Sequence, residues 1–167
     1  MSLLSCKSSS NKSVKVENTV VEQEQTEYKE FKFPKPVGYV SDYGHILSET
    51  ETKELRSIIK EFGDNTTNEI FIITIGSIAP YTDIHKFATD LANNWGVGKV
   101  KKDNGLVIVV SKEIKKIAIS TGKGTEKIVT DKICKNILKT IVVPKFKEEQ
   151  YFIGLKKGLI EIILKWK

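Results

Sequence analysis

Apolar residues recur with the 3.6-residue period of an α-helix in four stretches of the chain. In the first stretch the apolar side chains fall at i, i+3, i+4 and i+7, at Leu55, Ile58, Ile59 and Phe62. It opens with a capping-box pattern, in which Ser48 and Glu51 each accept a hydrogen bond from the other's backbone N–H. We expect the second helix to end at Gly96 and the third at Pro144. The four expected helices begin near Ser48, Thr82, Thr130 and Glu148.

Three shorter runs, residues 70–75, 106–110 and 116–120, are dense in β-branched side chains and therefore favour β-strands. The first is almost continuously apolar, as expected of a central strand covered on both faces. Residues 111–115 are short enough for a hairpin, so the last two strands should be antiparallel. A strand, a crossover helix and a second strand form a parallel unit. The pattern predicts an α/β fold, a three-layer α/β/α sandwich on a small mixed β-sheet with an antiparallel hairpin.

Residues 1–36 differ in composition from the rest of the chain. Most of them are Ser, Lys, Glu, Gln and Asn, with scattered valines, and such a segment buries too little apolar surface to offset the entropy cost of ordering. Pro34 and Pro36 then favour extended backbone. We therefore expect residues 1–36 to be a disordered polar tether and residues 37–167 to be one folded domain.

Cys6 follows Leu3-Leu4-Ser5, an order that resembles a bacterial lipoprotein cleavage box. Only five residues precede the cysteine, whereas a signal peptide is much longer. Either a signal sequence belongs upstream of this sequence or the match is due to chance. The first interpretation predicts an exported protein of the periplasm or cell envelope, anchored to the membrane by lipid on Cys6. The second leaves the protein cytoplasmic.

The formal net charge is +6, and five of these units lie on residues 37–167. This excess is modest, and the lysines are not interleaved with the aromatic side chains of a nucleic-acid stacking surface. We therefore predict no nucleic-acid binding, and we expect a monomer. The two cysteines indicate neither a disulfide nor a zinc cluster, because Cys6 lies in the polar segment and Cys134 falls within an apolar helical pattern.

The stretch Gly122-Lys123-Gly124-Thr125 invites comparison with a phosphate-binding loop. A P-loop needs Gly-x-x-x-x-Gly-Lys-Ser/Thr, so that a run of backbone N–H groups surrounds the phosphates. The position of the first glycine is occupied by Ile117, and Lys123 is followed by Gly124 instead of a hydroxyl residue. The stretch is therefore not a P-loop.

The predicted hairpin brings Asp103-Asn104-Gly105 beside residues 121–124, with Glu126 and Asp131 just beyond. Carboxylate and amide oxygens are the ligands of hard divalent cations, and glycines let the backbone fold tightly enough to add carbonyl oxygens. This end of the hairpin therefore suggests a Ca²⁺ or Mg²⁺ site. The alternative is that both glycine-containing segments are ordinary turns and that Glu126 and Asp131 are acids favoured at helix starts.

Five motifs follow one another along residues 37–167. They are Val40-Ser41-Asp42 with Ile46-Leu47-Ser48, Asn94-Trp95-Gly96-Val97-Gly98, Asp103-Asn104-Gly105, Gly122-Lys123-Gly124-Thr125-Glu126, and Pro144-Lys145-Phe146 through Tyr151 and Gly154. In this order they resemble the TPM domain family. The resemblance implies an α/β/α sandwich in a domain that is commonly exported and tethered to a membrane. It also implies Ca²⁺ binding and acid phosphatase activity.

The resemblance adds Asp42 to the expected metal ligands, on the hypothesis that its loop packs against the same glycine-rich edge. The other role open to Asp42 is to cap the loop before Ser48. The expected metal ligands are Asp42, Asp103, Glu126 and Asp131. Further binding contacts are expected from Asn104, Gly105, Gly122, Lys123 and Gly124.

Two functions follow from these expectations. The first is a Ca²⁺-binding, membrane-tethered interaction or maintenance module whose partner is a membrane protein. The alternative is a metal-dependent acid phosphatase that acts on a phosphate ester, with Lys123 offering positive charge to the phosphate. The sequence shows no evident nucleophile or general acid, so the question of enzymatic activity stays open.

Overall fold

The computed structural model of the protein describes residues 31–167. Cys6 and most of the predicted tether lie outside the described residues. In the described part, four strands form one sheet in the order β1-β2-β3-β4. The strands are β1 (Val40–Asp42), β2 (Glu69–Thr74), β3 (Gly105–Ser111) and β4 (Lys116–Thr121).

The sheet is mixed, as predicted. β1 runs parallel to β2, and β2 runs parallel to β3. β3 and β4 form the expected antiparallel hairpin, in which Leu106 pairs with Thr121 and Ser111 pairs with Lys116. Every residue of β3 is buried, because this strand has a neighbour on each side and helices over both faces. β1 was not predicted, since Val40 is its one strongly apolar residue and its extended form comes from pairing with β2.

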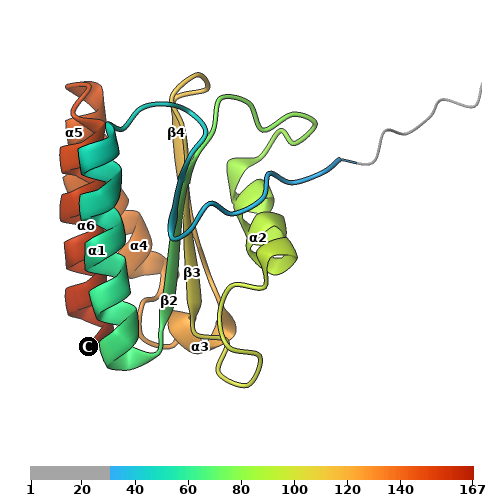
Figure 1. Ribbon diagram of the computed structural model, residues 1–167, viewed down its shortest axis with the longest axis vertical. Coiled ribbons are helices and arrows are strands. Elements are labelled where there is room, and N and C mark those ends of the chain that lie inside the picture. The colour runs from blue at the N-terminus through green and yellow to red at the C-terminus, as the bar shows by residue number, and fades with distance from the viewer. Residues whose placement is uncertain (1–30) are drawn as a thin grey trace, which may run out of the picture. The chain divides into compact units, whose positions relative to one another are not determined.

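Helices cover both faces of the sheet and confirm the α/β/α sandwich (Figure 1). α2 (Ile84–Trp95) lies on one face, over a cluster that includes Phe87, Leu91 and Val107. The opposite face carries α1 (Glu49–Thr66) and the C-terminal helices, over a second cluster that includes Leu55 and Leu159. Each face of the sheet therefore has its own apolar core.

The helix ends follow the local sequence signals. The predicted capping box is confirmed, because the Glu51 N–H donates to Ser48 Oγ at 3.3 Å and the Ser48 N–H donates to Glu51 Oε2 at 2.7 Å. Asp83 caps α2 by accepting from the His85 N–H at 2.6 Å. Gly96 ends α2 in the left-handed conformation, with φ of 64°.

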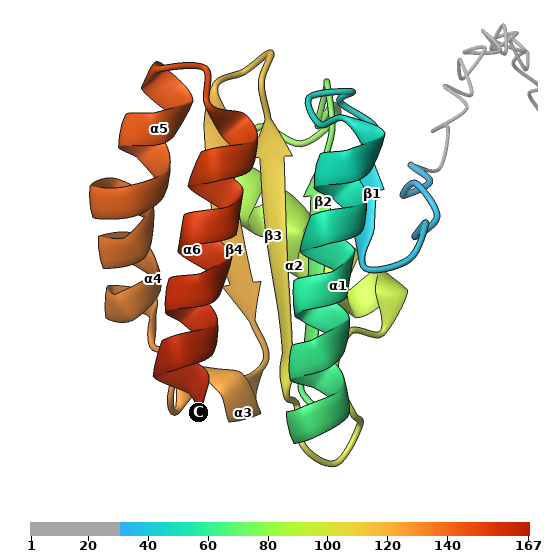
Figure 2. The same ribbon diagram turned by 60° about the vertical axis from the view of Figure 1, so that its left-hand side comes forward.

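The C-terminal helices differ from the sequence prediction at Pro144. The third helix does not end there, because α4 (Asp131–Ile137) continues through a π-helical turn, η1 (Leu138–Val142), into α5 (Val143–Lys147). Pro144 falls in the first turn of α5, where a backbone N–H is not needed. α6 (Tyr151–Trp166) then returns between α1 and the α4–α5 segment (Figure 2).

Packing of the domain begins at Phe31, before the boundary predicted at Val37. The rings of Phe31 and Phe33 contact each other edge to face, with centroids 4.9 Å apart, and Phe33 lies 5.6 Å from the ring of Phe87 on α2. The Trp95 indole N–H donates to the Pro34 carbonyl at 2.8 Å. Residues that precede the two prolines therefore pack against the core through two aromatic side chains.

Among residues 31–167, every helix is too short or too polar to span a bilayer.

Candidate functional site

The open end of the β3–β4 hairpin brings the two predicted glycine-containing segments together. The Gly122 N–H donates to the Gly105 carbonyl at 2.9 Å. The Asp103 carbonyl accepts from the N–H groups of Gly124 at 3.1 Å and Thr125 at 3.2 Å. Residues 103–105 are therefore hydrogen-bonded to the start of α3 (Lys123–Glu126), as the antiparallel pairing predicts. We call this region, residues 98–105 and 121–126, the glycine edge.

Glycine is required at this edge because the backbone segments approach too closely for a side chain. A Cβ atom at Gly122 would overlap the Asp103 carbonyl, and one at Gly124 would overlap the Lys102 carbonyl. A Cβ atom at Gly105 would lie 2.5 Å from the carbonyl oxygen of Val97. The glycines therefore permit backbone to pack on backbone, which explains the Gly-Lys-Gly stretch without a phosphate.

Asn104 connects three segments at the glycine edge. Its side-chain amide donates to the Thr67 carbonyl at 2.9 Å and to Asn68 Oδ1 at 3.1 Å, and its Oδ1 accepts from the Lys99 N–H at 2.9 Å. The residue is buried. Its polar atoms are thus used to join the end of α1 and the α2–β3 loop to the start of β3, so the amide serves structure at the position where we expected a ligand contact.

Thr125 and Glu69 complete the edge. Thr125 belongs to a motif noted in the sequence, but the sequence analysis gave neither residue a role. Thr125 is fully buried, and its hydroxyl donates to the Gly105 carbonyl at 3.0 Å. The Glu69 carboxylate accepts from the Gly98 N–H at 2.8 Å and pairs with the Lys99 ammonium at 2.7 Å. Burial raises the pKa of Glu69, but the hydrogen bonds from Lys99 and Gly98 outweigh it and hold that pKa below its ordinary value.

Three of the predicted ligands have exposed carboxylates near this edge. Asp103 lies in a turn with φ of 46°, a left-handed conformation that aspartate tolerates. Glu126 ends α3, and Asp131 begins α4. None of the three carboxylates has an ion-pair or hydrogen-bond partner within residues 31–167. In that part of the chain no group of three or more His, Cys, Asp or Glu side chains is arranged to hold a metal ion.

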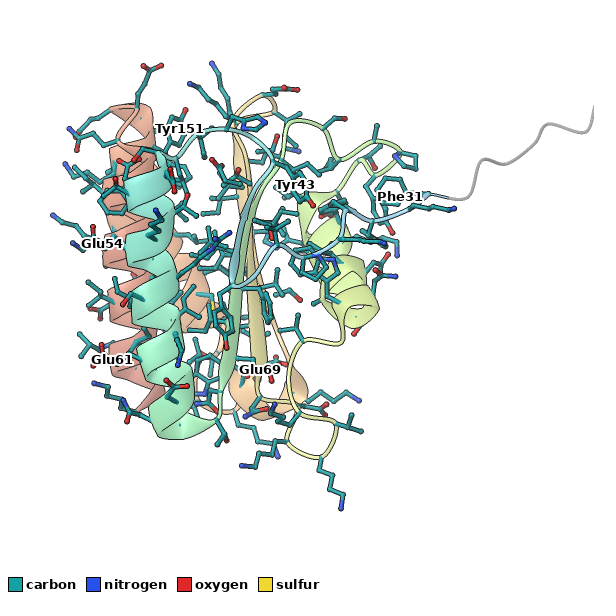
Figure 3. The ribbon with its side chains drawn as sticks, in the orientation of Figure 1. Phe31, Tyr43, Glu54, Glu61, Glu69 and Tyr151 are labelled. Atoms are coloured by element: carbon teal, nitrogen blue, oxygen red, sulfur yellow. The ribbon has the colours of Figure 1, made fainter. Side chains whose placement is uncertain are left out.

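Asp42 lies at the opposite end of the sheet from the glycine edge. It pairs in register with Thr74 at the end of β2, whereas Gly105 pairs with Glu69 at the start of that strand. Figure 3 shows Glu69 near α3 and Tyr43, the neighbour of Asp42, toward the other end. The expectation that the Asp42 loop packs against the glycine edge is therefore corrected, because parallel pairing places the end of β1 far from the start of β3.

The carboxylate of Asp42 instead organises the loop between β1 and α1. It accepts from the N–H groups of Ile46 at 3.2 Å and Leu47 at 3.1 Å, and from the Thr74 hydroxyl. This is the capping role that the sequence left open for Asp42. The loop enters α1 directly afterwards at the Ser48 capping box.

These features define a small α/β domain with three parallel strands and one antiparallel edge strand. At the open end of its hairpin, glycines allow two backbone segments to pack together. The model of the TPM domain family matches residues 40–164, and the chain belongs to this family. No curated protein is significantly similar to the chain.

Three solved structures resemble the domain. The N-terminal domain of a protein from P. gingivalis superposes with a TM-score of 0.70 and 25% identity, over 76% of this chain and 80% of that one. An N-terminal domain from Corynebacterium glutamicum gives a TM-score of 0.62 and 14% identity, over 82% and 86% of the two chains. A protein of the psychrophilic bacterium Bizionia argentinensis gives 0.62 and 24%, over 72% and 86%. The last two similarities show the fold alone.

Proposed function

We propose that this TPM domain is an interaction module that binds Ca²⁺ weakly at the glycine edge and is held at a membrane through lipid on Cys6. The observation that supports the cation site is the placement of Asp103 and Glu126. Both carboxylates are exposed, and neither is paired within residues 31–167. Both extend from backbone that the hydrogen bonds to the Asp103 carbonyl hold in place.

The available donors set the character of the site. The carbonyls of Asp103 and Gly105 and the side chain of Asn104 already accept or donate hydrogen bonds within the domain. The cation would therefore be held by the carboxylates of Asp103 and Glu126, with water in the remaining positions. Such a ligand set favours Ca²⁺, which accepts irregular geometry, over Mg²⁺, which demands an octahedron. We expect a dissociation constant of about 10⁻³ M, within the range of extracellular calcium modules.

The surroundings of these carboxylates support recognition of a partner. Val100, on the same loop as Asp103, is 97% exposed, and Ile128, just after α3, is 50% exposed. A cation here would neutralise the carboxylates beside exposed apolar side chains. A membrane protein with an apolar contact surface and a carboxylate or phosphate oxygen for the cation is the partner class that suits this edge.

Lys123 favours the second candidate function, a metal-dependent phosphomonoesterase. The side chain is exposed at the start of α3, on the same edge as Glu126. In such an enzyme the Lys123 ammonium would neutralise negative charge on the phosphate group of the substrate. The interaction module remains the proposal, because the buried polar groups of the edge, Asn104 and Thr125, are used to hold backbone together.

The experiment that tests the cation site is a Ca²⁺ titration of the isotope-labelled protein followed by amide NMR. We expect saturable shifts at Gly105, Gly122 and Glu126, and Asp103→Asn should weaken the response about tenfold, because one of two charged ligands is lost. Asp64→Asn is the matched control, since Asp64 is an exposed carboxylate on α1 whose partner is Lys60. Shifts of equal size and midpoint in Asp103→Asn and wild type would refute the site.

Hydrolysis of p-nitrophenyl phosphate, measured with Ca²⁺ and with a chelator, separates the two candidate functions. The proposal expects no cation-dependent turnover. Turnover that the chelator and Lys123→Ala both abolish would instead establish the phosphatase.

A further inference from the structure

The positive charge of the domain is concentrated in its C-terminal helices. Residues 37–130 contain twelve basic and twelve acidic side chains, so their net charge is zero. Residues 131–167 contain nine lysines and four carboxylates, a net charge of +5. The excess of the domain therefore lies entirely on the layer formed by α4, η1, α5 and α6, which covers one face of the sheet (Figure 2).

Most of these lysines have no counter-charge of their own. Lys145, Lys156 and Lys165 form ion pairs, with Glu148, Glu54 and Glu161. The other six have no carboxylate within ion-pair distance among residues 31–167. Lys132, Lys135 and Lys139 are all exposed and recur at i, i+3 and i+7 along α4 and η1. An unbalanced row of this kind attracts an acidic partner.

The same layer carries a groove with an apolar lining. The groove has a volume of about 410 Å³ and lies between the η1–α5 segment and α6. Its apolar lining comes from Ile141, Pro144 and Ile160. The polar lining residues are Thr140, Lys145, Lys157 and Glu161, and the Glu161 carboxylate is paired with the Lys165 ammonium. We call it the α5–α6 groove.

Exposed apolar side chains extend the groove along α6. Ile160 is 40% exposed, and Ile153 and Leu164, on the same side of the helix, are 39% and 57% exposed. Together with Lys157 they fall at i, i+4, i+7 and i+11. This is the spacing of a stripe that meets another helix along its length.

We propose that the α5–α6 groove binds an acidic amphipathic helix of another protein. The apolar side chains of the partner would enter the groove against Ile141, Pro144 and Ile160, and its carboxylates would meet Lys157 and the lysine row of α4. A groove between two helices is concave and fits one inserted helix, whereas a bilayer presents a broad, flat surface. The charge, the groove and the apolar stripe therefore favour a helical partner over a lipid surface.

The test uses a fluorescein-labelled peptide with leucines at i, i+3, i+4 and i+7 and glutamates elsewhere. The full-length protein is added to the peptide in buffer that contains a chelator, and binding is measured from the fluorescence anisotropy. The chelator keeps this test independent of the proposed cation site. We expect binding that Lys157→Glu weakens about tenfold and Ile160→Ser about fivefold. Lys116→Glu makes the same charge change at the exposed first residue of β4 and should leave the affinity unchanged.

Several outcomes would overturn the proposal. They are an absence of binding, equal weakening by Lys116→Glu, and capture of the protein by phosphatidylserine vesicles without binding of the peptide. The variants change exposed side chains only, and amide NMR spectra of each would confirm an unchanged fold. In the wild-type spectrum, peptide-induced shifts at Thr140, Lys157 and Ile160 support the groove, and shifts confined to Gly105 and Gly122 would contradict it.

Discussion

The carboxylate of Asp42 holds the loop between β1 and α1, and its removal should destabilise the domain without affecting the cation site. Asp42→Ala removes the acceptor of two backbone N–H groups and of the Thr74 hydroxyl. Because hydrogen bonds to a charged acceptor are stronger than neutral ones, we expect a loss of about 3 kcal/mol in the free energy of unfolding. Urea denaturation measures the loss, and a Ca²⁺ titration should give the wild-type midpoint. A changed midpoint would place Asp42 in the cation site after all.

Among the residues of the glycine edge, Gly124 is the glycine whose replacement should lower the free energy of unfolding most. A Cβ atom there would overlap the Lys102 carbonyl, which belongs to backbone that cannot simply rotate away. Gly124→Ala should therefore lower the free energy of unfolding by about 3 kcal/mol, as overpacking does in a tight core. Gly96→Ala is the control, because nothing lies within 4 Å of that position and its φ of 64° alone opposes a side chain. The control should cost about 1 kcal/mol. Equal losses in the two variants would show that the edge can relax.

At the scale of elements, the segment before β1 contributes to the packing and stability of the domain. Phe31 and Phe33 cover the ring of Phe87 on α2, and Phe31 also lies 5.4 Å from the ring of Tyr81. Since both phenylalanines are only half-buried, Phe33→Ala should destabilise the domain by about 2 kcal/mol, less than a fully buried aromatic would. Lys32→Ala, at the exposed position between them, should be neutral. Thermal unfolding measures the stability of both variants. If Phe33→Ala left the stability unchanged, the domain would begin at Val37, as the sequence predicts.

In the C-terminal helices, the position of Pro144 differs from the helix end that its sequence propensity predicts. Pro144 is a helix terminator by propensity, but here it follows the π-helical turn η1 and lies in the first turn of α5. Gly158 on α6 faces this turn, because a Cβ atom there would lie 2.5 Å from Cγ2 of Val142. The close packing of α6 on η1 therefore depends on glycine, as the spacing of Gly154 and Gly158 suggests.

At the scale of the whole molecule, the membrane tether remains a proposal that rests on Cys6. Two acyl chains on this cysteine would anchor the domain firmly, because two chains bind a bilayer far more strongly than one. We expect the protein, expressed in its host from the native gene with its full upstream sequence, to fractionate with membranes. Cys6→Ser should move it to the soluble fraction. A soluble distribution of both forms would end the lipoprotein interpretation.

The local pattern of the chain determines its elements, because periodicity, caps and β-branched runs act over a few residues. α1, α2, β2 and the β3–β4 hairpin follow from that pattern, and the hairpin alone requires Asp103 to meet Gly124. Only the tertiary structure decided the rest. The extended form of β1 depends on pairing with β2, and the position of Asp42 depends on the direction of that pairing. The commitment of Asn104 and Thr125 to structure, and the groove that η1 and α6 form, depend on contacts between residues far apart in the chain. Sequence spacing does not encode those contacts.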